Sequence, residues 1–285
     1  MKALIVILLL AALMAVAGSQ GGVAWRGVPV FALCAGVAIL IQWLAFVPAF
    51  IRQTESFYDL VGSLTYLTVT GLAVALSGAT DGRSLLLAAL VAIWALRLGS
   101  FLFARIRQDG KDSRFDRIKP SPPRFLVAWS TQGLWVLYTM ACALAAISGA
   151  TPTALAPLDL VGVAVWLAGF SIEVVADRQK RVFRAQAGAG GFITTGLWAR
   201  SRHPNYFGEI VLWCGVALIA LPALEGWRYL TLVSPLFVFL LLTRVSGIPL
   251  LERKAEKRWG EDPEYLAYRD ATPVLVPRLR AARRG

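Results

Sequence analysis

The feature that most constrains this chain is a series of apolar segments, each long enough to cross a lipid bilayer. A transmembrane helix needs about 20 predominantly apolar residues, and hydrophobic residues make up 57% of the chain against 16% charged. Ordinary globular domains are about 45–50% apolar and about 25% charged. A soluble fold could not bury so much apolar surface, and disorder requires low hydrophobicity. We therefore predict eight spans, at 3–18, 28–50, 60–78, 84–104, 125–148, 157–176, 206–223 and 229–250.

Basic residues are concentrated in alternate loops. The loops at 105–124 and 177–204 and the tail after 251 are rich in Lys and Arg, whereas the loop at 149–156 carries no charge. The positive-inside rule then places the loops after even-numbered spans, and both termini, in the cytoplasm. The net charge of +12 thus indicates topology and contact with anionic membrane lipid rather than nucleic acid. The first span could also be a cleaved signal peptide. We prefer a retained helix, because eight spans place all the basic loops and both termini on the cytoplasmic side.

The chain divides into N-terminal transmembrane helices at 1–50, a main membrane domain at 51–277 and a basic tail at 278–285. Within the main domain, the charged segment at 252–269 contains three interspersed aromatic residues and is typical of a cytoplasmic interfacial helix. The sequence has a single His and three Cys, all three in apolar runs without metal-ligand spacing, so we expect no metal site.

Ionisable residues inside a membrane protein are costly and mark functional sites by default. The first such group begins before the third span, where Glu55 and Tyr66 follow helical spacing and Tyr58 lies beside Glu55 at i+3. A carboxyl and a phenol beside lipid could hold a carbonyl oxygen and donate a proton to it. The alternative is a helix N-terminus whose acidic residues complement the helix dipole.

Two further groups of ionisable residues in the predicted helices contain arginine. Arg97 lies within the apolar run of the fourth span, close to Trp94, and needs an anionic partner or water. A helical stripe later in the chain has acidic residues at one end and arginines at the other, which suits the ribose hydroxyls and phosphates of a dinucleotide. Intrahelical ion pairing is the alternative interpretation. The stripe consists of Glu173, Asp177, Arg181 and Arg184.

The most specific pattern lies at 188–209. Its glycines would allow a ligand to approach the backbone, and Arg202 and His203 supply positive charge and hydrogen-bond donors. Asn205 and Glu209 share one helix face at i, i+4. The glycines follow no strand, so they do not form a Rossmann fingerprint.

The string Gly196-Leu-Trp198, followed by Arg202-His203-Pro204-Asn205-Tyr206-Phe207-Gly208-Glu209, resembles the hallmark of the steroid 5-alpha-reductase superfamily, in particular its bacterial branch. The resemblance covers roughly residues 50–277. It implies an all-α integral membrane protein of about eight transmembrane helices, with a seven-helix reductase core, one additional N-terminal helix and a cytoplasmic amphipathic C-terminal segment. It also implies a bacterial inner-membrane enzyme that uses NADPH to reduce a carbon–carbon double bond conjugated to a carbonyl in a steroid-like or other lipid.

The resemblance also implies roles for individual residues. Asn205 and Glu209 match the nicotinamide end of the cofactor site, while Gln53 and Glu55 resemble a pair that anchors the substrate ketone. The expected cofactor-binding residues are Asn205, Glu209, Arg97, Asp177, Arg181, Arg184, Arg202, His203, Tyr206 and, more loosely, Arg244. The expected catalytic residues are Glu55, Tyr58, Tyr66 and Gln53.

The chain departs from the family pattern at three positions. Trp94 stands where the family has a catalytic Tyr, Glu173 replaces an Asn, and Thr54 separates the Gln and the Glu that are adjacent in steroid enzymes. Trp has no acidic proton, so the role of the acid falls to Glu55, Tyr58 or Tyr66.

Two other functions remain open. Isoprenylcysteine carboxyl methyltransferases share an Arg-His-Pro-x-Tyr-x-Gly string and an acidic tail, which Glu252 also fits, and they bind S-adenosylmethionine. The third hypothesis is a non-catalytic membrane protein that binds lipid. The pair Asn205 and Glu209, the Asp177 stripe and the Glu55 group favour the reductase.

Overall fold

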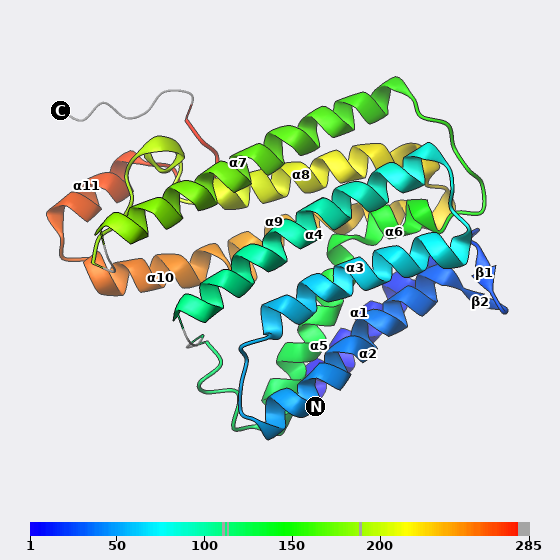
Figure 1. Cartoon of the computed structure of the whole chain (residues 1–285), viewed down its shortest axis with the longest axis horizontal. Helices are drawn as coiled ribbons and strands as arrows, with labels where there is room; N and C mark the ends of the chain where they lie inside the picture. The colour runs from blue at the N-terminus through cyan, green and yellow to red at the C-terminus, as the bar shows by residue number, and fades with distance from the viewer. Residues whose placement is uncertain (110–111, 113, 188–189, 279–285) are drawn as a thin grey trace. The chain divides into compact units, whose positions relative to one another are not determined.

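The computed structural model describes residues 1–109, 112, 114–187 and 190–278. Gly188 and the basic tail beyond Arg278 lie outside the described residues. The helices, shown in Figure 1, are α1 (Lys2–Ser19), α2 (Val30–Ile51), α3 (Tyr58–Ser77), α4 (Gly82–Asp109), α5 (Pro122–Thr139), α6 (Ala141–Ile147), α7 (Pro157–Ala187), α8 (Pro204–Ala220), α9 (Val233–Leu240), α10 (Ile248–Trp259) and α11 (Pro263–Ala271). The strands β1 (Ala24–Trp25) and β2 (Val28–Pro29) form a short antiparallel hairpin.

The predicted all-α membrane fold is confirmed. In the described part of the chain, 7 helices are long and apolar enough to cross a membrane, and the number reaches 8 if the bent pair α5 and α6 is one span. That pair bends by 59° near Met140, within the segment predicted as one span at 125–148. The last span runs further than expected, from Gly226 to Trp259, because α10 continues it.

Local sequence explains where several helices begin and end. Pro122, Pro157 and Pro204 each start a helix, where the missing N–H costs nothing because it would have no partner within the helix. Gly78 ends α3 in the left-handed conformation, with a φ of 60° that glycine adopts without strain. The charged segment predicted as one interfacial helix at 252–269 is instead two helices, α10 and α11, separated around Gly260.

The chain forms two compact units, of which the first contains residues 1–159 and 216–234. In this unit α2 packs against α3 and α5, and α3 packs against α4. A buried ion pair connects the first turn of α4 to that of α7: Arg83 and Asp159 are 2.7 Å apart, and their side chains are 1% and 4% exposed. An aromatic cluster fills the opposite end of the unit, with Tyr58, Phe115, Phe125 and Trp129 buried together.

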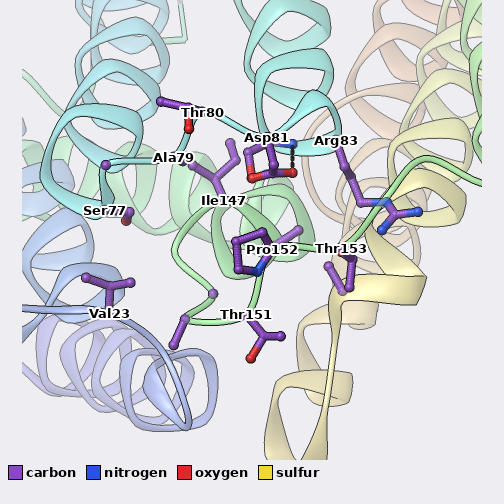
Figure 2. Close-up of a pocket in the computed structure, with 16 residues that line it drawn as sticks. Val23, Ser77, Ala79, Thr80, Asp81, Arg83, Ile147, Thr151, Pro152 and Thr153 are labelled. Carbon is purple, nitrogen blue, oxygen red and sulfur yellow. Dashed lines mark hydrogen bonds between the residues drawn. The ribbon is translucent and has the colours of Figure 1, made fainter.

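A cavity of about 190 Å³ lies in this unit where α3 ends and α4 begins. Figure 2 shows Ser77, Thr80 and Asp81 on one side of it and Thr151 on the other. Asp81 accepts a hydrogen bond from the Ser84 amide, which caps the start of α4. The cavity lies at the far end of α3 from Glu55, and a helix of 20 residues is about 30 Å long. It is therefore not part of the polar group that the sequence placed around Glu55.

The second unit contains residues 160–215 and 235–285. Within it, α7 and α8 run side by side (Figure 1) because glycines allow their backbones to touch. A Cβ on Gly208 would lie 2.6 Å from the Gly169 carbonyl, and one on Gly215 would lie 2.6 Å from that of Gly162. Such distances exclude any side chain, so these glycines fix the spacing of the two helices.

Candidate functional site

The predicted motif of the second unit is organised around Glu252 of α10. Its Oε1 lies 2.7 Å from His203 Nε2, and its Oε2 lies 3.1 Å from an Arg202 guanidinium nitrogen. The His203 ring also stacks on Tyr206, with centroids 5.7 Å apart and planes only 9° from parallel. Arg202 and His203, adjacent in sequence, are therefore held by one carboxylate from a segment about 50 residues away.

Burial lowers the pKa of His203, while the hydrogen bond to Glu252 acts in the opposite direction. A neutral ring donates its Nε2–H to the carboxylate and leaves Nδ1 as an acceptor. Nδ1 is buried and has no hydrogen-bond partner within the described residues, and the same holds for Nε of Arg202. Buried polar atoms of this kind are uncommon in native proteins and point to an absent ligand or water.

The C-terminal segment holds this motif in place. The Arg202 amide donates to the Pro273 carbonyl, the Ser201 hydroxyl donates to the Leu275 carbonyl, and the Arg278 amide donates to the Arg200 carbonyl. The Tyr268 hydroxyl donates to the Trp198 carbonyl at 2.8 Å, and burial raises the pKa of that phenol. Residues 272–278 thus form a strap along residues 200–202.

A cavity of about 250 Å³ adjoins His203 in the second unit. The loop after α7, together with α10 and α11, encloses it, and these elements lie at the same end of α7 (Figure 1). Trp259 donates to the Gly190 carbonyl at 2.8 Å, which ties α10 to the glycine-rich loop. The aromatic residues that line the cavity are Phe183, Phe192, Trp198, Trp259, Tyr265 and Tyr268. The basic residues that line it are Lys180, Arg184, Arg202, Lys254 and Arg258.

This lining has two chemical parts. Phe192 contacts Trp259, Tyr265 and Tyr268, with ring centroids 5.7, 5.3 and 5.9 Å apart. Lys254 and Arg184 are exposed at the rim. Aromatic faces suit a planar heterocycle, and exposed basic groups suit phosphate.

A second polar group lies on the α7–α8 pair. Asn205 donates to Asp177 at 3.2 Å, and Asp177 and Glu173 are both buried. Glu209 is half-buried one turn after Asn205. The structure therefore brings Asn205 and Asp177, both of which the sequence suggested as cofactor residues, into contact. Arg181 and Arg184, further along the same helix, are exposed, as is Arg244, which lies in a π-helical turn after α9.

Glu55 lies in the first unit and is only 4% exposed. Its Oε1 accepts the Asp112 amide at 2.8 Å, and its Oε2 lies 2.5 Å from the Lys119 ammonium. Helix α3 begins only at Tyr58, so Glu55 belongs to the turn before the helix, not to the helix itself. Both carboxylate oxygens of Glu55 therefore accept hydrogen bonds from residues in the connection between α4 and α5.

The other predicted catalytic residues are more dispersed. Gln53 is exposed, has a φ of 50° and donates to the Phe50 carbonyl at the end of α2. Tyr58 donates to the Ala128 carbonyl at 2.9 Å within the aromatic cluster. Tyr66 is buried and meets Trp94 edge-on, with centroids 5.1 Å apart. Arg97 is half-buried and lies over Phe101. From the sequence, Lys119 is only one of several basic residues in the loop at 105–124. The aromatic residues of the segment at 252–269 likewise indicate only an interfacial helix.

Comparison with known proteins identifies the family to which the chain belongs. The family described as "Protein of unknown function (DUF1295)" matches residues 45–272. The chain is 41% identical over 126 residues to "3-oxo-5-alpha-steroid 4-dehydrogenase 1" of Macaca fascicularis, covering 43% of this chain and 42% of that one. It is 32% identical over 123 residues to the Rattus norvegicus protein of the same name, covering 42% of each. The Bos taurus protein is 38% identical over 74 residues, which cover 26% of this chain and 28% of that protein.

The chain thus spans less than half the length of these relatives. No solved structure matches it. The resemblance first seen in the motif at 196–209 is confirmed by both comparisons, and the family match covers most of the chain. The chain belongs to the DUF1295 family and is a steroid 5-alpha-reductase-like membrane protein.

Proposed function

We propose that the protein is an NADPH-dependent membrane reductase that reduces a carbon–carbon double bond conjugated to a carbonyl in a steroid-like or other lipid. The observation that carries this proposal is the aromatic and basic cavity beside His203, in the same unit as Asn205 and Asp177. The names of the curated relatives support the reaction class and a 3-oxo-steroid type of substrate.

The residues present fit a dinucleotide. His203 lines the cavity, and its buried Nδ1 has no hydrogen-bond partner among the described residues. The aromatic rings of the cavity suit the stacking of a nucleotide base, and the basic residues at its rim suit phosphate groups. The carboxylate and amide of Asp177 and Asn205 suit hydrogen bonding to a ribose or a carboxamide. Bound NADPH would supply the hydride. We assign Asn205, Glu209 and Asp177 to its nicotinamide end, and Arg202, His203, Tyr206, Arg181, Arg184 and Arg244 to the remainder.

One feature of the geometry favours a second candidate. Glu252 binds both Arg202 and His203, which also matches the acidic tail of membrane methyltransferases that bind S-adenosylmethionine. The cavity could accept the adenosine of either molecule. The two candidates differ in the phosphates, because S-adenosylmethionine has none and would leave the cations at the rim without an anionic partner.

The assay that tests the proposal uses the full chain solubilised in detergent. A 3-oxo-4-ene steroid and a straight-chain lipid enone are supplied separately with NADPH, and consumption of NADPH is followed together with the saturated product. The reductase predicts a saturated ketone from at least one enone. Transfer of a methyl group from S-adenosylmethionine to a lipid carboxylate, without enone reduction, would instead support the methyltransferase.

Asn205→Ala is expected to weaken NADPH binding about tenfold or more. Removing one partner of a buried hydrogen-bonded group costs about 1–3 kcal/mol, and about 1.4 kcal/mol corresponds to a tenfold change in affinity. Titration of the solubilised protein with NADPH measures the loss. Gln186→Ala is the matched control, because that amide is exposed near the end of α7. Equal affinity in the two variants would remove Asn205 from the cofactor site.

A further inference from the structure

Two buried polar atoms beside the cavity of the second unit have no hydrogen-bond partner within the described residues. They are Nδ1 of His203 and Nε of Arg202. Both residues line the cavity of about 250 Å³, and their side chains are 6% and 12% exposed. Buried polar groups in native proteins almost always have a partner. Two such atoms on adjacent residues therefore mark a place where a bound molecule would form hydrogen bonds.

Glu252 determines which of the two atoms accepts and which donates. Its Oε1 lies 2.7 Å from His203 Nε2, and an ionised carboxylate only accepts, so Nε2 carries the ring hydrogen. Burial lowers the pKa of His203, which favours the neutral ring, and Nδ1 of that ring is an acceptor. The Arg202 guanidinium keeps its proton in proteins, so its Nε–H is a donor. The cavity thus presents one buried acceptor and one buried donor.

The same contacts fix the positions of the two side chains. Oε2 of Glu252 lies 3.1 Å from one guanidinium nitrogen of Arg202, and a second guanidinium nitrogen donates to the Arg269 carbonyl at 3.3 Å. The His203 ring stacks on Tyr206, with planes only 9° from parallel. Because each side chain is held by two contacts within the protein, the donor and the acceptor are preorganised for a ligand.

Three of the aromatic side chains that line the cavity offer ring faces, because their N–H and O–H groups already donate to the backbone. The Tyr268 hydroxyl donates to the Trp198 carbonyl, and the Trp198 indole donates to the Ala176 carbonyl. Trp259 likewise donates to the Gly190 carbonyl. Aromatic faces stack on any nucleotide base and tolerate its identity. Recognition of one particular base therefore depends on the buried acceptor and the buried donor.

Adenine matches this pattern of one acceptor and one donor. Its 6-amino group donates, and the ring nitrogens on either side of that group accept. Hypoxanthine has an oxygen in place of the amino group, so it would place an acceptor against the acceptor Nδ1 of His203. The phosphates of a dinucleotide also have no hydrogen to donate to that atom. Of the polar groups on a nucleotide, the edge of adenine therefore satisfies both buried atoms together.

We infer that Arg202 and His203 recognise the adenine base of the nucleotide, and that Glu252 is the positioning residue that sets their hydrogen-bonding pattern. The adenine amino group donates to Nδ1 of His203, and Nε–H of Arg202 donates to an adjacent ring nitrogen. The inference rests on the proposed function, because it names the part of NADPH that occupies this cavity. The exposed cations at the rim, Lys254 and Arg184, are then left to the phosphates.

The test measures base preference with NADP⁺ and with nicotinamide hypoxanthine dinucleotide phosphate, in which oxygen replaces the adenine amino group. Each is titrated into the full chain solubilised in detergent. The parent is expected to bind the hypoxanthine analogue about tenfold more weakly, which corresponds to about 1.4 kcal/mol and to one buried group left unpaired. His203→Phe keeps a ring to stack on Tyr206 but has no acceptor, so it should lose most of this preference. Equal affinities in the parent, or an undiminished preference in His203→Phe, would overturn the inference.

A second variant tests the positioning role. Glu252→Gln keeps the shape of the side chain, but an amide donates as well as accepts, so His203 is no longer held in one tautomer and the preference should fall. An undiminished preference would remove Glu252 from this role. Lys257→Met is the control, because Lys257 is an exposed cation on the same helix, and it should keep the parent's preference. The ratio of two affinities is measured within each variant, so a general loss of binding does not change it.

Failure of this inference and failure of the proposed function give different results. A parent that binds NADP⁺ and the hypoxanthine analogue equally well contradicts only the recognition of adenine. A parent that binds neither nucleotide contradicts the proposed function. S-adenosylhomocysteine and S-inosylhomocysteine, which differ at the same position of the base, then give the same comparison, and a parent that does not prefer the first of them contradicts the inference as well.

Discussion

Glu55→Gln is expected to reduce an enone about 10²–10⁴-fold more slowly than the parent, with NADPH affinity nearly unchanged. The amide has the shape of the carboxylate but no charge, so it cannot hold the Lys119 ammonium through the 2.5 Å contact seen in the structure. Single-turnover reduction at saturating NADPH measures the effect. Asp116→Asn is the control, because Asp116 is 42% exposed and 3.8 Å from the same ammonium. If Glu55→Gln reduces the enone as fast as the parent, Glu55 has no catalytic role.

Asp159→Ala is expected to lose about 3–5 kcal/mol of stability. Arg83 is only 1% exposed and donates to both oxygens of Asp159, at 3.0 and 2.7 Å. Removing the carboxylate leaves a buried guanidinium without its counter-charge, which is the strongly destabilising way to break such a pair. Thermal unfolding of the solubilised variant measures the loss.

The double variant Arg83→Met with Asp159→Leu provides the comparison for that result. Replacing both members of a buried ion pair by apolar residues of similar size is often close to neutral. The double variant should therefore melt well above Asp159→Ala. If the two melt together, the cost comes from loss of the Asp159 contact to the Ala156 amide and not from a buried charge.

The membrane spans could be predicted from the sequence because each depends on local composition alone. The predicted starts of the third and fourth spans, residues 60 and 84, fall within two residues of the starts of α3 and α4. The bend at Met140 could not be predicted, because no proline or glycine marks it, and the segment that follows is as apolar as the one before.

The motif residues could be recognised because they are close in sequence. Asn205 and Asp177 were both recognised from their motifs, and they meet because two neighbouring helices present them and glycines bring those helices together. The orientation of Gln53 could not be predicted, for a local reason. Its backbone is left-handed just after the end of α2, and its side-chain amide donates to the Phe50 carbonyl. Spacing along a helix could not reveal that turn.

The partners of the motif residues come from distant segments. Lys119 is 64 residues from Glu55, and Glu252 is 49 residues from His203. Their pairing depends on how the α4–α5 connection and the C-terminal helices fold back, and no local pattern encodes this. The aromatic residues that line the cavity were equally hard to predict. Trp259, Tyr265 and Tyr268 have the spacing of an ordinary interfacial helix, and they line the cavity because that segment folds as two helices, α10 and α11.

The most direct test of the central claim is the identity of the nucleotide that co-purifies with the detergent-solubilised chain, measured by mass spectrometry after mild denaturation. The reductase predicts NADPH or NADP⁺ in the parent and a marked decrease in Asn205→Ala. S-adenosylmethionine or S-adenosylhomocysteine in its place, present equally in both proteins, would contradict the account.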